Sequence, residues 1–298
     1  MTTENVVIGK NLVKKYKGFE LNVEELQIPK GFATALIGEN GAGKTTLLNL
    51  MSGIRKDFTG EMKFFDEQLD CLDDSIRERI GYTAPTNLFL PQWTIKQVEE
   101  MTELLFEGFH ADRFQELIKE LGIPAEAGKK VKELSDGNKM KLMIANVLAR
   151  DTELLILDEP ASPMDPLMRD KLCEMFREYL AEGEGKRSIF FSTHNVADME
   201  NVTDYVLLME KGKIVETGFV EQLKEKYILI KGETEDYDKV KEYIIGGSKS
   251  KYGFEGLCLS EDLDKLAGVN VAAETPTLTQ ICVKIMKEYS SLQSKGEQ

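Results

Sequence analysis

The stretch of sequence that decides the fold is Gly38-Glu39-Asn40-Gly41-Ala42-Gly43-Lys44-Thr45-Thr46. It fits the phosphate-binding pattern G-x-x-x-x-G-K-[ST], in which glycines let backbone N–H groups turn toward a polyphosphate. The apolar run Ala33–Ile37 before it predicts a buried strand, and residues 46–51 after it predict the start of a helix. A helix N-terminus carries partial positive charge, so this order predicts a phosphate site. We expect the site to be built from Gly38, Asn40, Gly41, Ala42, Gly43, Lys44, Thr45 and Thr46.

Lys44 and Thr45 have separate expected roles in this loop, because a lysine there reaches the β- and γ-phosphates and a hydroxyl there ligates Mg²⁺. Turnover also needs a carboxylate for the metal and a group that positions the attacking water. The apolar run 154–157 predicts a buried strand that ends in Asp158-Glu159. We expect Asp158 to hold Mg²⁺, directly or through water, and Glu159 to orient or deprotonate the water. Two solvated acids at the end of a strand are the alternative.

The two histidines of the chain receive different interpretations. His194 follows a second predicted buried strand, residues 188–192, where an imidazole can donate to a γ-phosphate oxygen, and we expect it to be catalytic. His110 lies in a helical region without a motif, and we expect it to be structural.

Composition excludes some classes of function. The 298 residues carry a net charge of −14, which disfavours nonspecific nucleic-acid binding. The cysteines, Cys71, Cys173, Cys258 and Cys282, are widely spaced, which predicts reduced thiols in a cytoplasmic protein. The chain shows no signal peptide and no apolar run of membrane-spanning length. We therefore expect it to reach a membrane only through a partner.

The pattern of apolar residues predicts an α/β fold with a mixed sheet. Strands near Val6 and Leu21, joined by a Lys17-Gly18 turn, predict an antiparallel β subdomain. Residues 94–121 have helical periodicity, which predicts a helical subdomain inserted at about 86–150. The larger domain is expected to span 1–225. Residues 226–298 predict a small α+β accessory domain with a final helix at 277–289 and a disordered tail from Ser290.

The segment Leu134-Ser135-Asp136-Gly137-Asn138 resembles the signature, usually LSGGQ, of the nucleotide-binding subunits of ABC transporters. With the motifs above, the resemblance covers about residues 6–218 and implies an ABC-type P-loop NTPase that binds ATP and Mg²⁺. It also implies a head-to-tail dimer, homodimeric or heterodimeric. Each ATP would then lie between one subunit's phosphate loop and the other's Ser135 and Gly137. Tyr16 matches the family's adenine-stacking aromatic, and an ordinary strand tyrosine is its alternative.

The sequence departs from the family pattern at three places. Pro85 stands where the family has a glutamine that senses Mg²⁺, with Thr86 or Asn87 as weak substitutes. Asp136 puts a carboxylate where it would repel a triphosphate unless it points away. Residues 161–165 match the segment that crosses to the partner subunit, with Pro-Met in place of Gly-Leu before Asp165, the family-typical acid. All catalytic groups remain, so we expect an active ATPase.

The resemblance implies an ATP-hydrolysing subunit that drives a separate integral membrane permease from the inner face of the membrane. Residues 273–278 resemble the tail of bacitracin- and antibiotic-resistance exporter ATPases, which favours export. Trp93 is interpreted either as a core anchor or as part of the groove that receives a permease helix. The alternative function is a soluble ABC ATPase acting on ribosomes or DNA, which the single phosphate loop, the lack of long heptad runs and the acidic charge disfavour. A nonhydrolytic member of a heterodimer is disfavoured by the complete set of catalytic groups.

Overall fold

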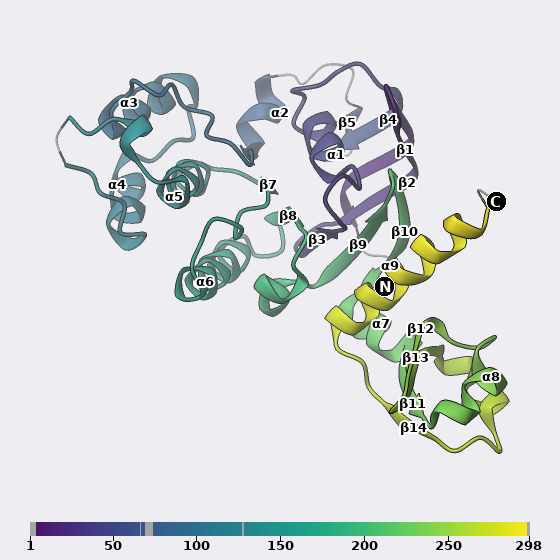
Figure 1. Ribbon diagram of the computed structural model, residues 1–298. Coiled ribbons are helices and arrows are strands. Elements are labelled where there is room, and N and C mark those ends of the chain that lie inside the picture. The colour runs from purple at the N-terminus through teal and green to yellow at the C-terminus, as the bar shows by residue number, and fades with distance from the viewer. Residues whose placement is uncertain (1–3, 66, 69–73, 127, 297–298) are drawn as a thin grey trace. The chain divides into compact units, whose positions relative to one another are not determined.

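The computed structural model describes residues 4–65, 67–68, 74–126 and 128–296, and of residues 67, 68, 74 and 291–296 the backbone alone. It contains two compact units, Met1–Ile214 and Val215–Gln298 (Figure 1). The sequence predicted a boundary at 225/226. The structure assigns α7 (Val220–Lys226) to the second unit, because this helix packs against elements that follow it in the chain.

The first unit opens with the predicted antiparallel sheet, whose strand order is β2-β1-β4-β5. Its strands are β1 (Asn5–Tyr16), β2 (Phe19–Pro29), β4 (Thr59–Phe64) and β5 (Glu67–Gln68). The Lys17-Gly18 turn joins β1 to β2 in the expected register, Tyr16 opposite Phe19. Tyr16 thereby stands at the end of a hairpin.

The second sheet has the order β10-β9-β3-β8-β7-β6 and is parallel from β9 to β6. Its strands are β3 (Ala33–Ile37), β6 (Ile80–Thr83), β7 (Leu154–Asp158), β8 (Ser188–Thr193), β9 (Tyr205–Glu210) and β10 (Lys213–Phe219). Five of these strands lie in the first unit, and the edge strand β10 contains the boundary between the units at 214/215. Every residue of β3, β7 and β8 is buried, as the continuous apolar runs predicted. Parallel strands end at one edge of a sheet, so the segments that follow them meet there.

Helices cover this sheet. α1 (Lys44–Met51) packs against β7, and α6 (Pro166–Glu182) packs against β8. One apolar core joins α1, the parallel sheet and the antiparallel sheet through residues such as Leu36, Leu47, Met62 and Phe190. The mixed-sheet α/β fold is therefore the predicted one.

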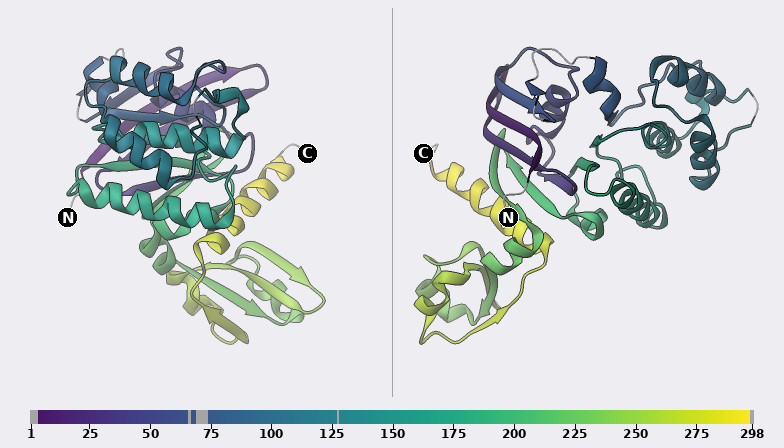
Figure 2. Two further views of the ribbon diagram at one scale, coloured as in Figure 1. Left: turned by 90° about the vertical axis from the view of Figure 1, so that its left-hand side faces the viewer. Right: turned by 180° about the vertical axis from the view of Figure 1, so that it is seen from behind.

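The helical subdomain lies on the side of the unit away from the antiparallel sheet (Figure 2). The expected helical stretch 94–121 is two helices, α3 (Ile95–Leu105) and α4 (Ala111–Glu120), and α5 (Asp136–Leu148) follows. Their core includes Val98, Phe114, Leu117 and Leu142. Short helical segments elsewhere in this unit are α2 (Asp74–Arg79), η1 (Val131–Glu133), η2 (Val196–Asp198) and η3 (Glu200–Val202).

The second unit is an antiparallel sheet of order β12-β13-β11-β14 with its own core of Ile230, Val240, Phe254, Cys258 and Leu266. Besides α7 it comprises β11 (Tyr227–Gly232), η4 (Thr234–Asp236), α8 (Tyr237–Val240), β12 (Ile245–Ser250), β13 (Gly253–Leu259), η5 (Ser260–Leu266), β14 (Val271–Glu274) and α9 (Leu278–Gly296). This composition matches the α+β expectation.

The final helix α9 differs from the expected disordered tail, because it continues from Ser290 to Gly296. Ile281 and Ile285 of α9 are buried, and Lys284 Nζ lies 2.8 Å from the Glu255 carboxylate, so the helix is held firmly before that point. Residues 297 and 298 lie outside the described residues.

Three of the cysteines, Cys173, Cys258 and Cys282, are buried free thiols, and Cys71 lies outside the described residues. Among the helices that the structure describes, none combines the length and the apolarity needed to cross a bilayer.

Candidate functional site

The phosphate loop connects the end of β3 to the start of α1. Gly41 and Gly43 have φ of 86° and 111°, a region that favours glycine. The Lys44 ammonium donates to the carbonyl oxygens of Gly38 at 2.8 Å and of Glu39 at 3.2 Å. The loop therefore wraps around the lysine and turns its backbone toward the space in front of α1.

The turn between β9 and β10 supports this loop from behind. The Gly212 N–H donates to the Ala42 carbonyl at 2.7 Å. A Cβ at Gly38 would lie 2.4 Å from the carbonyl oxygen of Met209, so the two backbones approach as closely as glycine permits. Gly38 and Ala42 therefore shape the loop, and the other predicted loop residues line the pocket in front of it.

Asp158 ends β7 and is fully buried. Its Oδ1 accepts a hydrogen bond from the Ser192 hydroxyl, and the Thr45 hydroxyl lies beside the carboxylate. Burial raises the pKa of Asp158, and the two hydroxyls oppose the shift. Its Oδ2 has no hydrogen-bond partner among the described residues. Mg²⁺ prefers oxygen ligands such as carboxylates and hydroxyls. The Oδ2 oxygen of Asp158 and the hydroxyl of Thr45 therefore fit this ion.

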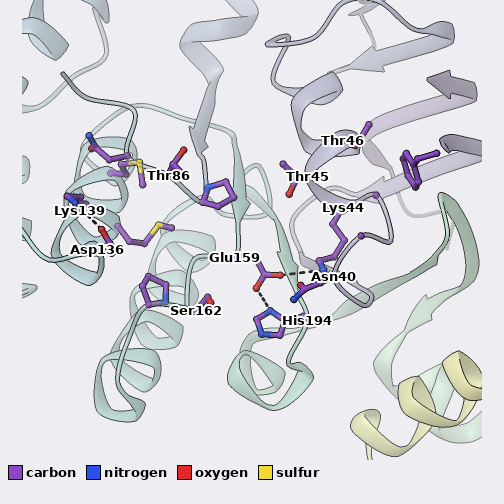
Figure 3. A pocket seen from close by; sticks show the side chains of 18 of the residues that line it. Asn40, Lys44, Thr45, Thr46, Thr86, Asp136, Lys139, Glu159, Ser162 and His194 are labelled. Carbon is purple, nitrogen blue, oxygen red and sulfur yellow. Dashed lines mark hydrogen bonds and ion pairs between the residues drawn. The ribbon is translucent and has the colours of Figure 1, made fainter. Parts of the chain in front are cut away.

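Glu159 connects the phosphate loop to His194 (Figure 3). One carboxylate oxygen lies 3.4 Å from Lys44 Nζ, and the other lies 2.7 Å from His194 Nδ1. The residue has φ of 51°, the strained conformation that often accompanies functional sites. The structure thus brings together five predicted site residues: Lys44, Thr45, Asp158, Glu159 and His194.

Sequence reasoning missed Ser192 as a site residue. Its hydroxyl donates to Asp158 and accepts the Glu159 backbone N–H at 2.9 Å, so one side chain fixes both acids. The sequence shows only a serine directly after the apolar run of a buried strand, which does not indicate where its hydroxyl points.

Lys44, Thr45, Glu159 and His194 line a pocket of about 1130 Å³, large enough for a nucleotide. Its wall includes Tyr16, Phe19, Asn40, Gly41, Gly43, Lys44, Thr45, Thr46, Pro85, Thr86, Asn87, Asp136, Lys139, Met140, Met143, Glu159, Ser162, Pro163 and His194. Tyr16 is 42% exposed, and its ring lies 6.4 Å from that of Phe19. Two aromatic rings at one end of a phosphate pocket can stack on a base.

Ser135 and Gly137 lie on the first turn of α5 and are not among the residues that line this pocket. The Ser135 hydroxyl accepts the Asn138 N–H at 3.3 Å and caps the helix. A Cβ at Gly137 would lie 2.8 Å from the Pro163 carbonyl oxygen, so close packing within the chain also requires this glycine. One chain therefore does not bring these two residues to its own phosphate loop.

The structure distinguishes between the two substitutes for the missing glutamine. The Asn87 side-chain amide bonds the backbone of Phe89, donating at 2.7 Å and accepting at 3.3 Å. Thr86 points into the pocket (Figure 3), so its hydroxyl is the better placed of the two. Asp165 caps α6 by accepting the Met168 N–H at 3.1 Å.

A second, mainly apolar groove of about 400 Å³ lies between α3, α5 and the segment after β6. Trp93 lines it and also packs against the helical core, so its interpretation as a core anchor is confirmed, and its interpretation as part of a groove for a permease helix stays a prediction. Arg77, Asn146 and Arg150 add polar groups, and the other wall residues are Ser52, Ile80, Tyr82, Leu88, Phe89, Met101, Thr102, Leu105, Phe106 and Val147.

Comparison with known proteins agrees with this geometry. The family model described as ABC transporter matches residues 21–162. An uncharacterised ABC transporter ATP-binding protein, all4389 of Nostoc sp., is 30% identical over 91% of this chain and 85% of its own length. The nickel import ATP-binding protein NikO of Rhodobacter capsulatus is 30% identical over 68% of this chain and 85% of its own length. Because the relatives include an import protein, family membership alone sets no direction of transport.

Two solved structures share the fold. The dimeric ATP-binding cassette MJ0796 bound to ADP and Pi is 22% identical with a TM-score of 0.62, covering 72% of this chain and 98% of that one. The ATP-binding subunit of an ABC transporter is 24% identical with a TM-score of 0.65, covering 74% and 92%. The chain therefore belongs to the ABC transporter family, as an ATP-binding subunit that hydrolyses ATP with Mg²⁺ as cofactor.

Proposed function

We propose that this chain drives a separately encoded membrane permease, and that two such ATPase subunits close head to tail around ATP. The observation that carries the proposal is the convergence of Lys44, Glu159 and His194 on one nucleotide-sized pocket, with the buried Asp158 carboxylate beside Thr45 at its wall. A triphosphate needs a cation, a metal carboxylate, a water-directing group and a γ-phosphate donor, and these residues provide one of each.

Each residue has a role that follows from its position. Lys44 binds the β- and γ-phosphates, and Thr45 with Asp158 holds Mg²⁺, which when bound neutralises phosphate charge. Glu159 accepts a proton from the attacking water or orients it. The Glu159 carboxylate accepts from His194 Nδ1, so Nε2 is the ring nitrogen left to face the γ-phosphate, and it donates there when the imidazole carries a proton on both nitrogens.

The head-to-tail arrangement explains why Ser135 and Gly137 lie on α5 rather than in their own chain's pocket. In the proposed dimer they contact the γ-phosphate held by the partner's loop, the Ser135 hydroxyl and the Gly137 N–H both donating. Tyr16 stacks on the adenine. Closure of two subunits is then the step that ATP binding drives.

The site proposal is tested by Glu159→Gln, which keeps the shape of the side chain and removes its basicity. We expect ATP to bind with retained affinity and to trap a dimer, while phosphate release falls by about 10²- to 10⁴-fold. Glu178→Gln on the exposed side of α6 is the matched control and should hydrolyse ATP normally. Normal phosphate release by the Glu159 variant would contradict the assigned role.

The permease proposal rests on the groove lined by Trp93. Its apolar wall with a few polar groups suits one face of a short amphipathic helix, and Leu105, 63% exposed, stands at its edge. The chain would then be peripheral on the inner face of the membrane.

We test this with affinity-tagged full chain, which should recover a membrane protein from detergent extracts. Leu105→Asp should lose that protein and keep ATP hydrolysis, because the substitution lies outside the nucleotide pocket. Recovery of ribosomes or DNA in its place would instead support the alternative of a soluble ABC ATPase.

Export is the direction we propose, on the resemblance of residues 273–278 to the tail of resistance-type exporter ATPases. In inverted membrane vesicles given ATP, an exporter accumulates its substrate inside the vesicle. Loss of preloaded substrate from those vesicles would overturn this direction.

A further inference from the structure

The first turn of α5 places an acid and a base on the wall of the nucleotide pocket across from the phosphate loop (Figure 3). Lys139 Nζ lies 2.9 Å from Asp136 Oδ1. The Asp136 side chain is 89% exposed, whereas that of Lys139 is 24% exposed. The lysine is therefore the better sheltered partner.

Asp136 and Lys139 have opposite effects on an anionic ligand. A carboxylate in the first turn of a helix is stabilised by the helix dipole, but it repels a polyphosphate in the same pocket. An ammonium there is disfavoured by the dipole and attracts the polyphosphate. The pair cancels the charge that Asp136 alone would place on this wall.

We propose that Lys139 is a nucleotide-binding residue, which Asp136 holds while the pocket lacks polyphosphate and which pairs with phosphate oxygens once ATP is bound. The inference rests on the proposed function, because in the head-to-tail dimer the first turn of α5 meets the phosphate held by the partner's loop. It assigns a use to Asp136, one of the residues that depart from the family signature.

The relative strengths of the two partnerships favour this exchange. A partly exposed ion pair between one ammonium and one carboxylate is weak. A phosphate offers more charge and more acceptor oxygens, so its charge-assisted hydrogen bonds are stronger. Asp136 stays solvated after the lysine leaves, because most of its side chain is already in contact with water.

The competing explanation is a structural pair that stabilises the start of α5. The two explanations predict different signs for the changes in ATP affinity that the two variants cause. If the pair is structural, Lys139→Met and Asp136→Asn break the same interaction and have the same effect. If Lys139 binds phosphate, removing it weakens ATP binding, whereas removing Asp136 releases the lysine and strengthens it.

The experiment measures binding of ATP with Mg²⁺ to the full chain by calorimetry, in the Glu159→Gln background so that ATP is not consumed. Lys139→Met should weaken binding about three- to tenfold, and Asp136→Asn should strengthen it about two- to threefold. Both changes should shrink when salt is raised from about 0.05 M to about 0.5 M. Lys139→Arg should bind like the parent.

Lys141→Met is the matched control, because it removes the same charge from the same helix at a position outside the pocket wall. Shifts of the same sign in Lys139→Met and Asp136→Asn, or no shift in either, would overturn the proposal. Lys44→Ala tests the proposed site separately: it should abolish binding, and unchanged affinity would instead refute the phosphate loop as the site.

Discussion

Ser192 is the residue whose removal should change the metal requirement of the enzyme. Burial raises the pKa of Asp158, and the hydrogen bond from the Ser192 hydroxyl opposes this rise. Asp158 must be ionised to hold Mg²⁺, so Ser192→Ala, by raising the pKa further, should raise the Mg²⁺ concentration needed for half-maximal hydrolysis. A carboxyl with a raised pKa loses its charge as pH falls, so the effect should be larger at about pH 6 than at about pH 8.

Ser188→Ala is the matched control for that variant. Ser188 is also a buried serine of β8, but it lies at the other end of the strand and accepts the Gly31 N–H. Its loss should lower stability and leave the Mg²⁺ dependence unchanged. An unaltered Mg²⁺ requirement in Ser192→Ala at both pH values would contradict the positioning role of Ser192.

Individual site residues were predictable where a sequence pattern fixes their place on the backbone. Lys44 and Thr45 follow a glycine loop, and Asp158, Glu159 and His194 follow buried strands, so topology alone brings them to one edge. Ser192 was not predictable, because a serine at the end of a strand has no pattern that shows where its hydroxyl points. The pairing of Asp136 with Lys139 also depends on side-chain rotamers, which the sequence does not specify.

At the scale of elements, α3 illustrates how a short signal positions a surface. Thr94 and Gln97 form a capping box at its start, each side chain bonding the other's backbone N–H. We expect Thr94→Ala to lower the free energy of unfolding by about 1 kcal/mol, because it leaves a helix N–H without its acceptor. Urea unfolding checks this, with Thr94→Ser as the conservative control. Equal stability of the Ala and Ser variants would contradict the capping role.

Element predictions from the sequence succeeded for buried strands and were less exact for helices. Runs such as Leu154–Asp158 are apolar throughout, and only a strand covered on both faces explains them at that length. In residues 94–121 the apolar residues keep a helical spacing even where the chain leaves one helix and enters the next. Phe109 and Phe114 both pack in the same core, although only Phe114 lies in a helix. Periodicity reports a shared buried face and does not report where a helix ends.

At the scale of the whole molecule, the sequence predicted two domains. The composition alone located the boundary between them and the start of a disordered tail, and the structure differs at both places. Residues 215–226 are charged like a linker, yet the Glu216 carboxylate lies 2.6 Å from Lys226 and accepts the Tyr227 hydroxyl. These contacts join the segment to the second unit. Similarly, α9 continues beyond Ser290 because its earlier turns are anchored by long-range contacts, among them Glu288 accepting the Gly246 N–H at 2.9 Å.

Because each unit has its own sheet and its own apolar core, we expect the chain to unfold in two separate transitions by calorimetry. Ile230→Val in the second core and Ile156→Val in the first remove the same methylene from fully buried positions. Each should cost about 0.5–1.5 kcal/mol and lower only the transition of its own unit. ATP with Mg²⁺ binds residues of the first unit, so it should raise that transition alone. A single transition, or one in which either substitution moves both, would show that the units fold as one.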